Sequence, residues 1–159
     1  MRKILIILCV VLAAVIFTNA SPGQAVDDVK IYYADRRMHR LVPMETQIKA
    51  ADVQECAEQV MKKLVSGRNS DEVIRFIPQD SKISVKVHKN TACVNLPHKI
   101  AENIPKNREN EQLFVYQIVN TLTSVSGIDN VTFTVDGRVS EKFMGFLNMR
   151  EIFVSDYDI

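Results

Sequence analysis

Alternating apolar and polar residues predict strands at several places along the chain. Residues 29–35, VKIYYAD, alternate as a strand with one buried face does. Residues 41–43 follow a charged turn and predict a short return strand that ends at Pro43. Residues 82–87 and 92–97 alternate on either side of HKNT, and this arrangement predicts a hairpin with a four-residue loop.

Apolar residues at helical spacing predict two helices. The first begins after Asp52, an N-cap candidate with Glu55 three residues later, and should end at Gly67 in the left-handed conformation. The second extends over about residues 109–125 and is stopped by Gly127. Its core-facing stripe consists of Phe114, Ile118, Leu122 and Val125.

The second helix carries a further, semi-polar stripe on the side away from these core residues. At about 100° per residue, this side is lined by Leu113, Tyr116, Asn120 and Thr123. Two interpretations remain open: either the apolar C-terminal residues fold over the stripe and Asn120 hydrogen-bonds their backbone, or the stripe is exposed and binds a partner. The first is favoured because so apolar a segment needs a place to be buried. Its large side chains are Phe143, Met144, Phe146, Leu147 and Met149.

The residues after this helix predict a strand and a tight turn. Residues 130–135 alternate, with β-branched Thr on the outer face. Asp136-Gly137 is typical of a type I′ turn, whose two central residues have positive φ. The order of elements is therefore β-α-β-β-α-β, with the short return strand after the first. It predicts an α+β fold, a two-layer sandwich in which two helices pack on one face of a mostly antiparallel sheet.

The N-terminal segment has the layout of a secretory signal. Arg2 and Lys3 precede an uninterrupted apolar run over residues 4–17, and small residues follow at 18–20. The run is shorter than the roughly 20 residues that span a bilayer as a helix, so a cleaved signal peptide and an uncleaved membrane anchor both remain open. We therefore expect an exported protein, either secreted or anchored by this segment. The chain divides into the signal or anchor at 1–20, a linker at 21–28, one domain at 29–150 and a C-terminal tail at 151–159.

Composition and charge exclude several classes of protein. The chain is 47% hydrophobic and 25% charged with a formal net charge of +1, which is typical of a folded domain and gives no basic surface for nucleic acid. Membrane contact is expected only through the N-terminal segment. Cys56 falls on the core side of the first helix, and Cys93 lies on the opposite side of its strand from the apolar residues. We therefore expect two reduced thiols rather than a disulfide.

No pattern of catalytic or metal-binding residues stands out. His39, His88 and His98 are predicted in a turn, in a hairpin loop and after a proline, outside any zinc-binding spacing. The sequence also lacks the glycine-rich phosphate-binding loops and the nucleophile motif of hydrolases. We therefore expect no catalytic residues, no metal and no cofactor, and a protein that is not an enzyme.

Residues 115–137, VYQIVNTLTSVSGIDNVTFTVDG, resemble the hallmark segment of the GerMN-type domain of bacterial sporulation and spore-germination proteins. In that family a helix ending in VNTLT leads through a Gly-containing turn into a strand and a D-G turn. The resemblance covers about residues 29–150 in a single copy, and it departs from the family at HKNT, where Gly is common, and at Cys9, which lacks a lipid-attachment motif. Its most specific matches are Asn120, Thr121, Leu122, Thr123, Asp136 and Gly137.

The resemblance implies a non-catalytic extracytoplasmic module with a role in sporulation or spore germination. We expect the module to bind other envelope or sporulation proteins, or a second copy of itself. The alternative is a receptor domain for a small ligand or a cell-wall fragment, which would need a concave pocket with converging polar groups. The chain has no Trp, and this disfavours a cleft that stacks on sugars.

Overall fold

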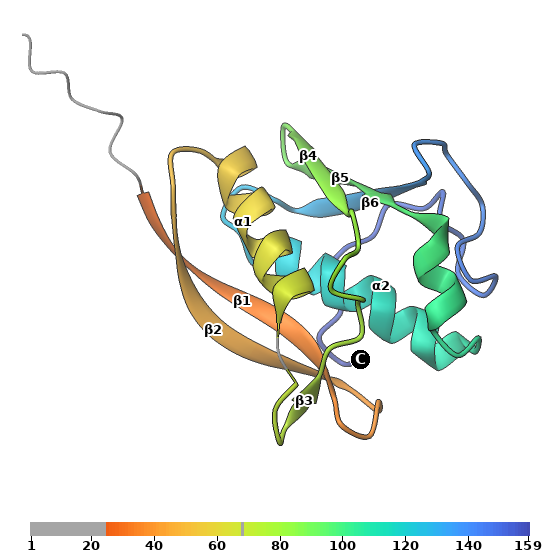
Figure 1. Ribbon diagram of the computed structural model, residues 1–159. Helices are drawn as coiled ribbons and strands as arrows, with labels where there is room; N and C mark the ends of the chain where they lie inside the picture. Colours follow the sequence, from red (N-terminus) through yellow and green to blue (C-terminus); the bar gives the residue numbers. More distant parts are fainter. Residues whose placement is uncertain (1–24, 68) are drawn as a thin grey trace, which may run out of the picture.

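The computed structural model describes residues 25–67 and 69–159, and the predicted signal or anchor at 1–20 lies outside them. The described chain folds into two three-stranded sheets and two α-helices (Figure 1). This arrangement confirms the α+β class and the mostly antiparallel strand pairing. The strands form two sheets, however, where one sheet covered by two helices was expected. No helix in the described ranges is both long and apolar enough to cross a bilayer.

The first sheet is an antiparallel ribbon with a short third strand. β1 (Ala25–Asp35) pairs along its length with β2 (Leu41–Ala50). β3 (Val73–Ile74), which the sequence pattern did not predict, pairs with the end of β1. Residues 25–28, predicted as the end of a linker, are therefore part of β1.

β2 continues past Pro43, which was expected to end it. The backbone N–H of Asp35 donates to the carbonyl oxygen of Arg40, and this bond fixes which residues of β2 turn their backbone groups toward β1. Pro43 and Tyr32 form a non-hydrogen-bonded pair, in which the nitrogen of Pro43 points to the free edge of the sheet. Its missing N–H therefore costs no bond of the ladder, and the strand continues to Ala50.

The second sheet combines a hairpin with a parallel strand. β4 (Ser84–His88) and β5 (Thr91–Leu96) are antiparallel, and β6 (Asn130–Val135) runs parallel to β5. The hairpin turn consists of Lys89 and Asn90 alone, which makes it tighter than the predicted loop. The chain passes from β5 to β6 through a short 3₁₀ helix, η1 (His98–Asn103), and the second α-helix.

The first helix, α1 (Val53–Ser66), begins at the predicted cap, where the Asp52 carboxylate accepts a backbone N–H of the first turn at 2.8 Å. Gly67 follows the helix with φ −53° and ψ 149°, so the predicted left-handed conformation is wrong. A Cβ at Gly67 would lie 2.5 Å from Cε1 of the buried Tyr33, whose hydroxyl donates to the carbonyl oxygen of Lys63. Close packing of the tyrosine ring, rather than the backbone conformation, requires glycine here.

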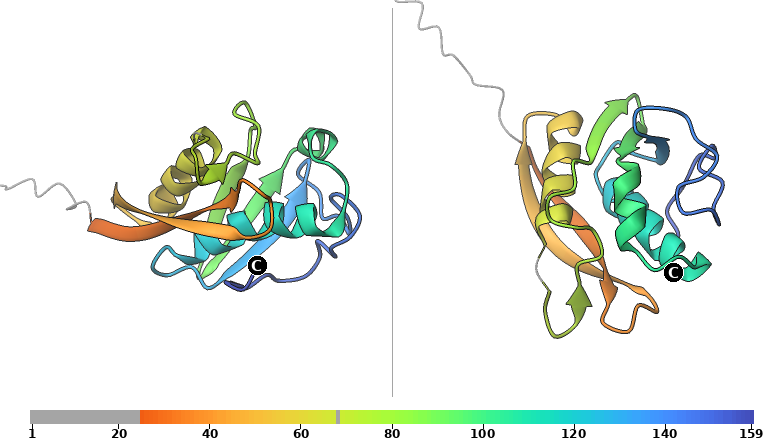
Figure 2. Two further views of the ribbon diagram at one scale, coloured as in Figure 1. Left: turned by 90° about the horizontal axis from the view of Figure 1, so that it is seen from below. Right: turned by 45° about the vertical axis from the view of Figure 1, so that its right-hand side comes forward.

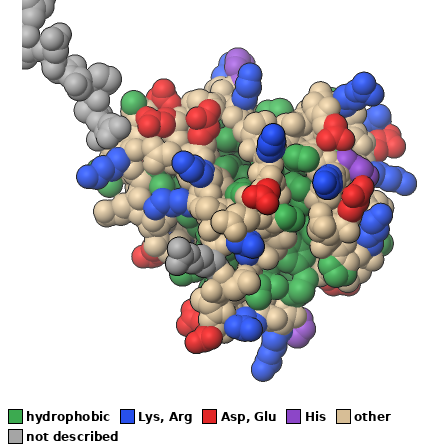
Figure 3. Space-filling model, in the orientation of Figure 1, with side chains coloured by type: hydrophobic (Ala, Val, Ile, Leu, Met, Phe, Trp, Pro, Cys, Tyr) green, Lys and Arg blue, Asp and Glu red, His purple; other side chains and the backbone are tan. Residues whose placement is uncertain are grey.

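The second helix, α2 (Arg108–Thr123), is the central element of the fold. It crosses the molecule between the β1–β2 ribbon and the second sheet (Figure 2). Most of its residues are buried, so the predicted core stripe and the semi-polar stripe are both largely covered. Around this core, charged side chains of both signs are interspersed over the face shown in Figure 3.

Candidate functional site

Two hydroxyl side chains near the end of α2 close the free edge of β1. The buried Thr121 Oγ1 accepts the backbone N–H of Tyr32 at 3.0 Å. Ser124 Oγ lies 3.0 Å from both the backbone nitrogen and the carbonyl oxygen of Lys30. Lys30 and Tyr32 turn their backbone groups to the same side of the strand. The end of the helix thus takes the place of a neighbouring strand, and the second sheet does not join the first at this edge.

Asn120 holds the C-terminal segment against the helix. The side chain is fully buried, and its amide pairs with the backbone of Asp156 in both directions. Nδ2 donates to the carbonyl oxygen of Asp156 at 2.6 Å, and Oδ1 accepts its N–H at 3.0 Å. The structure therefore places this residue under the C-terminal segment and away from solvent.

The other residues of the semi-polar stripe lie along the same helix face. Leu113 packs in a small buried cluster beside β1 and Ile159. Tyr116 meets the ring of Phe153 edge-on, with centroids 6.0 Å apart, and burial raises the pKa of its phenol. Thr123 donates to a carbonyl oxygen of its own helix at 2.8 Å. Residues 153–159 thus cover the stripe, rather than the apolar residues at 143–149.

Glu111 is a fully buried carboxylate that the sequence analysis missed. Its two oxygens accept backbone N–H groups from a C-terminal loop: Met144 at 2.7 Å and Gly145 at 3.4 Å on Oε1, Phe146 at 2.7 Å and Leu147 at 2.9 Å on Oε2. Such charge-assisted bonds hold the loop against the first turn of α2. The sequence could have indicated this role, because Glu111 is an acidic residue at helical spacing from the predicted core stripe.

The predicted turn residues have the backbone conformations that their positions need. Gly127, after α2, has φ 90°. Asp136 and Gly137 have φ 49° and 75°, and Val135 and Arg138 exchange backbone hydrogen bonds across them, as in a type I′ turn. These residues shape the chain on either side of β6.

The C-terminal segment also presents apolar side chains to solvent. Phe153 N–H and carbonyl oxygen both bond to Val131, so this residue adds a short antiparallel bridge to the outer edge of β6. Its ring points inward, edge-on to the ring of Phe133. On either side Ile152 and Val154 are 67% and 57% exposed. Three positions after Val154, Tyr157 is 61% exposed and stacks on the ring of Tyr32 in β1, with centroids 5.8 Å apart. Apolar side chains gathered at a strand edge are typical of a contact surface.

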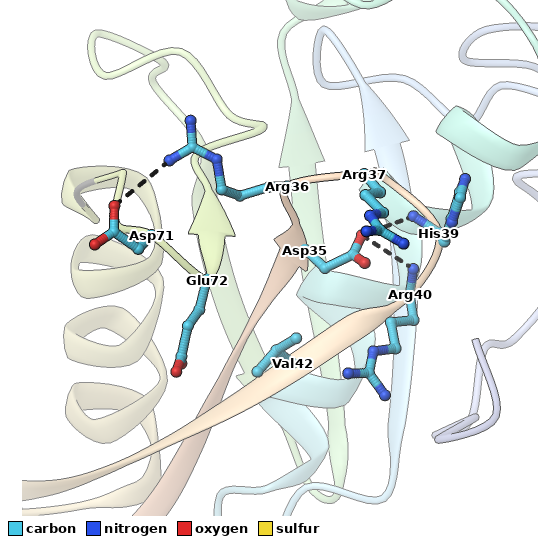
Figure 4. Close-up of a pocket in the computed structure, with 8 residues that line it drawn as sticks. All are labelled: Asp35, Arg36, Arg37, His39, Arg40, Val42, Asp71 and Glu72. Carbon is cyan, nitrogen blue, oxygen red and sulfur yellow. Dashed lines mark hydrogen bonds and ion pairs between the residues drawn. The ribbon is translucent and has the colours of Figure 1, made fainter.

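A surface hollow of about 670 Å³ lies at the turn between β1 and β2 (Figure 4). Asp35 accepts the backbone N–H groups of His39 and Arg40, and the bond from His39 lowers the pKa of its carboxyl. The arginines do not converge: Arg36 points to Asp71, 3.9 Å away, and the other basic side chains lie across the turn. The hollow is lined by Asp35, Arg36, Arg37, His39, Arg40, Val42, Asp71 and Glu72.

The thiols lie on the sides of their elements that the sequence predicted. Cys56 is fully buried in α1, and burial raises its pKa to about 11. Cys93 is exposed on β5, and neither thiol is paired. Within the part of the chain that the structure describes, no three His, Cys, Asp or Glu side chains gather as a metal site would require.

Comparisons with known proteins point to one family. The chain is similar in structure to the first GerMN domain of the sporulation protein GerM from Bacillus subtilis, with a TM-score of 0.60 at 20% identity, over 83% of this chain and 98% of that one. The tandem GerMN domains of the same protein give a TM-score of 0.64 at 20% identity, over 82% of this chain and 46% of theirs. A predicted lipoprotein from Clostridium perfringens gives a TM-score of 0.57 at 16% identity, over 83% of this chain and 88% of that one.

These likenesses establish the fold, and the chain spans about half of the tandem GerMN structure. Among curated protein sequences no relative is detected. The sequence profile of the Germane family, described as "Sporulation and spore germination", matches residues 30–141. This match covers most of the chain and includes the helix, strand and turn that carried the resemblance. The chain therefore belongs to the Germane family of sporulation and spore germination proteins.

Proposed function

We propose that this chain is a non-catalytic extracytoplasmic module that binds other envelope proteins during sporulation or spore germination. The polar residues of the family segment are engaged in holding the fold: Thr121 bonds β1, and Asn120 bonds the C-terminal segment. Because these side chains are committed to backbone hydrogen bonds, a structural role for them is favoured over a catalytic one.

Two observations support an extracytoplasmic location. The N-terminal apolar run has the layout of a signal or an anchor. One structural neighbour is a predicted lipoprotein, a class of protein that is attached to the outer side of a membrane. On this proposal residues 25–159 stand outside the cytoplasmic membrane, either free or tethered by the segment that precedes them.

The exposed apolar side chains at the C-terminal strand edge carry the proposal of a binding role. Ile152, Val154 and Tyr157 lie within six positions of one another and are each more than half exposed. Covering the exposed part of such apolar side chains with a partner stabilises the complex by about 25 cal/mol for each Å² of apolar surface removed from water. We therefore assign the contact surface to residues 152–157.

The test compares charge insertions inside and outside this surface. Val154→Glu should reduce sporulation efficiency and retention of the chain in envelope complexes, because a partner would have to desolvate the carboxylate. Val139→Glu is the matched control: Val139 is 70% exposed but lies outside residues 152–157. Both variants should unfold with free energies close to wild type, since both sites are on the surface. Equal behaviour of the two variants in cells would refute the proposed surface.

The hollow at the β1–β2 turn favours a second candidate, a receptor for a small anionic ligand. Arg36, Arg37 and Arg40 supply guanidinium groups that match a carboxylate or a phosphate. Against this candidate, the arginines point to different sides of the turn (Figure 4). Calorimetric titration with inorganic phosphate and with a dipeptide carboxylate decides it, with Arg37→Ala as the variant and Arg150→Ala as the control. Heat of binding that Arg37→Ala abolishes would favour the receptor.

A further inference from the structure

Residues 153–159, which we call the C-terminal strap, are held in the way that a bound peptide is held. The first of them, Phe153, exchanges two backbone hydrogen bonds with Val131 at the edge of β6, at 2.8 and 2.9 Å. The Phe153 ring is buried and lies edge-on to the rings of Tyr116 and Phe133. Backbone bonds to a strand edge, combined with a place for one large side chain, are typical of an added peptide segment.

Two further contacts of the strap follow at intervals of three residues. Asp156 exchanges two hydrogen bonds with the side-chain amide of Asn120, at 2.6 and 3.0 Å. A backbone oxygen of Ile159 accepts the N–H of Leu41 at 3.0 Å, and its side chain packs against the cluster that contains Leu113. Every third residue thus meets the body of the protein, as in a peptide with three residues per turn. We call the receiving residues the strap site: Leu41, Leu113, Tyr116, Asn120, Val131 and Phe133.

The strap has fewer buried contacts than the elements beneath it. Phe153 is its one buried residue, and between the contact points Val154 and Tyr157 are more than half exposed. A segment with few buried apolar contacts opens at a lower free energy than the whole domain unfolds. Its release would leave the edge at Val131 and the amide of Asn120 unpaired, and an extended segment of another chain can satisfy both.

The strap site and the strap differ in their relation to the family. The Germane profile matches residues 30–141, which include every residue of the strap site. Residues 153–159 follow the matched range. The site is therefore formed by the family domain itself, and the strap is a separate segment that fills it.

We propose that the strap is a displaceable cover, and that the strap site binds an extended segment of a partner protein in its place. This inference rests on the proposed function and adds a concealed site beneath the exposed surface of residues 152–157. The strap indicates the chemistry of the partner segment. It carries an aromatic residue at the position of Phe153, any residue except proline at that of Asp156, and an aliphatic residue at that of Ile159.

The attachment of the strap to the same chain makes it an inhibitor of this site. A segment tethered through a short linker competes at an effective concentration of roughly 1 mM. A separate segment therefore binds strongly only when the strap is released.

A fluorescent peptide with the sequence of residues 151–159 tests the site in the full-length chain. Asp156→Pro removes the N–H that Asn120 accepts and should release the strap. Asp156→Ala keeps both backbone groups and is the matched control. Fluorescence anisotropy should show that the peptide binds the Asp156→Pro chain at least about tenfold more tightly than wild type or Asp156→Ala, because the strap no longer competes.

Changes in the peptide test which contacts are recognised. Peptides that carry Phe153→Ala or Asp156→Pro should bind the Asp156→Pro chain at least about tenfold more weakly, since each loses one contact of the strap. A peptide that carries Val154→Ala should bind as the unchanged peptide does, because this side chain faces solvent. Equal affinity of the three chains for the unchanged peptide, or equal binding of all the peptides, overturns the proposal.

Amide exchange of the wild-type chain gives a second measurement that needs no variant. The N–H groups of residues 41, 153 and 156 all bond across the strap contacts and should exchange through one common opening. This exchange should be at least about tenfold faster than that of the buried Tyr32 N–H, which Thr121 accepts. Exchange of all four groups only through global unfolding overturns the displaceable cover.

These measurements are separate from the test of Val154→Glu in cells. If they fail and Val154→Glu still impairs sporulation, the strap site is removed and the exposed surface stands. If they succeed and Val154→Glu behaves as Val139→Glu, the exposed surface is removed and the strap site stands.

Discussion

The buried carboxylate of Glu111 gives the sharpest test of how the C-terminal residues are held. It accepts four backbone N–H groups from residues 144–147, at distances between 2.7 and 3.4 Å. Glu111→Gln keeps the shape of the side chain and replaces one oxygen by an NH₂ group. Because every facing group is a donor, this NH₂ must oppose N–H groups whichever way the amide turns.

The magnitude follows from the individual bonds. The least costly orientation keeps the oxygen on Phe146 and Leu147, at 2.7 and 2.9 Å, and loses the 2.7 Å bond to Met144. Losing one charge-assisted bond costs about 1.5–3 kcal/mol, and the two bonds that remain become neutral and about half as strong. We expect the free energy of unfolding to fall by about 3–5 kcal/mol, a large part of the 5–15 kcal/mol typical of a domain.

Urea unfolding of Glu111→Gln and of Glu109→Gln, followed by circular dichroism, measures the difference. Glu109 is exposed in the same first turn of α2, so its substitution makes the same chemical change and alters only the helix-dipole interaction, worth about 0.3–1 kcal/mol. Amide exchange should also speed up at residues 144–147 in Glu111→Gln alone. A difference below about 1 kcal/mol between the two variants would show that the carboxylate does not hold the loop.

Three further outcomes follow from the geometry. Asn120→Ala should lower the free energy of unfolding by about 1–3 kcal/mol, because the backbone of Asp156 loses both partners; an unchanged urea midpoint would contradict this. Gly67→Ala should cost about 1–3 kcal/mol, because its Cβ would meet the Tyr33 ring at 2.5 Å; a neutral result would mean that the ring moves freely. Thiol labelling of the native protein, mapped by peptide analysis, should modify the exposed Cys93 and spare the buried Cys56. Burial raises the pKa of Cys56 from 9.0 to about 11, so the stability that its neutral thiol contributes is lost as the pH rises from 9 through 11. Equal labelling of both thiols would contradict the burial.

Elements with a strong local pattern could be predicted from the sequence. The β4–β5 alternation, the Asp52 cap and the Asp136-Gly137 turn depend on neighbouring residues, and the structure has each of them close to the predicted place. The class of fold follows from the order of such elements. For the same reason the facing of the two thiols could be derived, since a helical or a strand period fixes the side of each residue.

Features that depend on distant residues could not be predicted in this way. Gly67 is glycine because Tyr33, far away in the chain, fills its space. Pro43 is tolerated within a strand because that strand lies at the edge of the sheet, a fact of topology. Glu111 is stabilised by a loop more than thirty positions away. A single sheet was the simplest arrangement of the predicted strands, but the side chains of α2 occupy the edge where the two sheets would have joined.

The polar residues of VNTLTS therefore have a structural role, and neither catalysis nor ligand binding is needed to explain them. A helix between two sheets must face strand edges as well as apolar faces, and an edge presents unpaired N–H and carbonyl groups. Thr121 and Ser124 meet one such edge, and Asn120 meets the backbone of the C-terminal segment. Small hydroxyl and amide groups can satisfy these backbone groups without the bulk of a strand. Polar side chains of this fold thus close strand edges. The edge at Ile152 and Val154 is left open, and binding to another chain should be sought there.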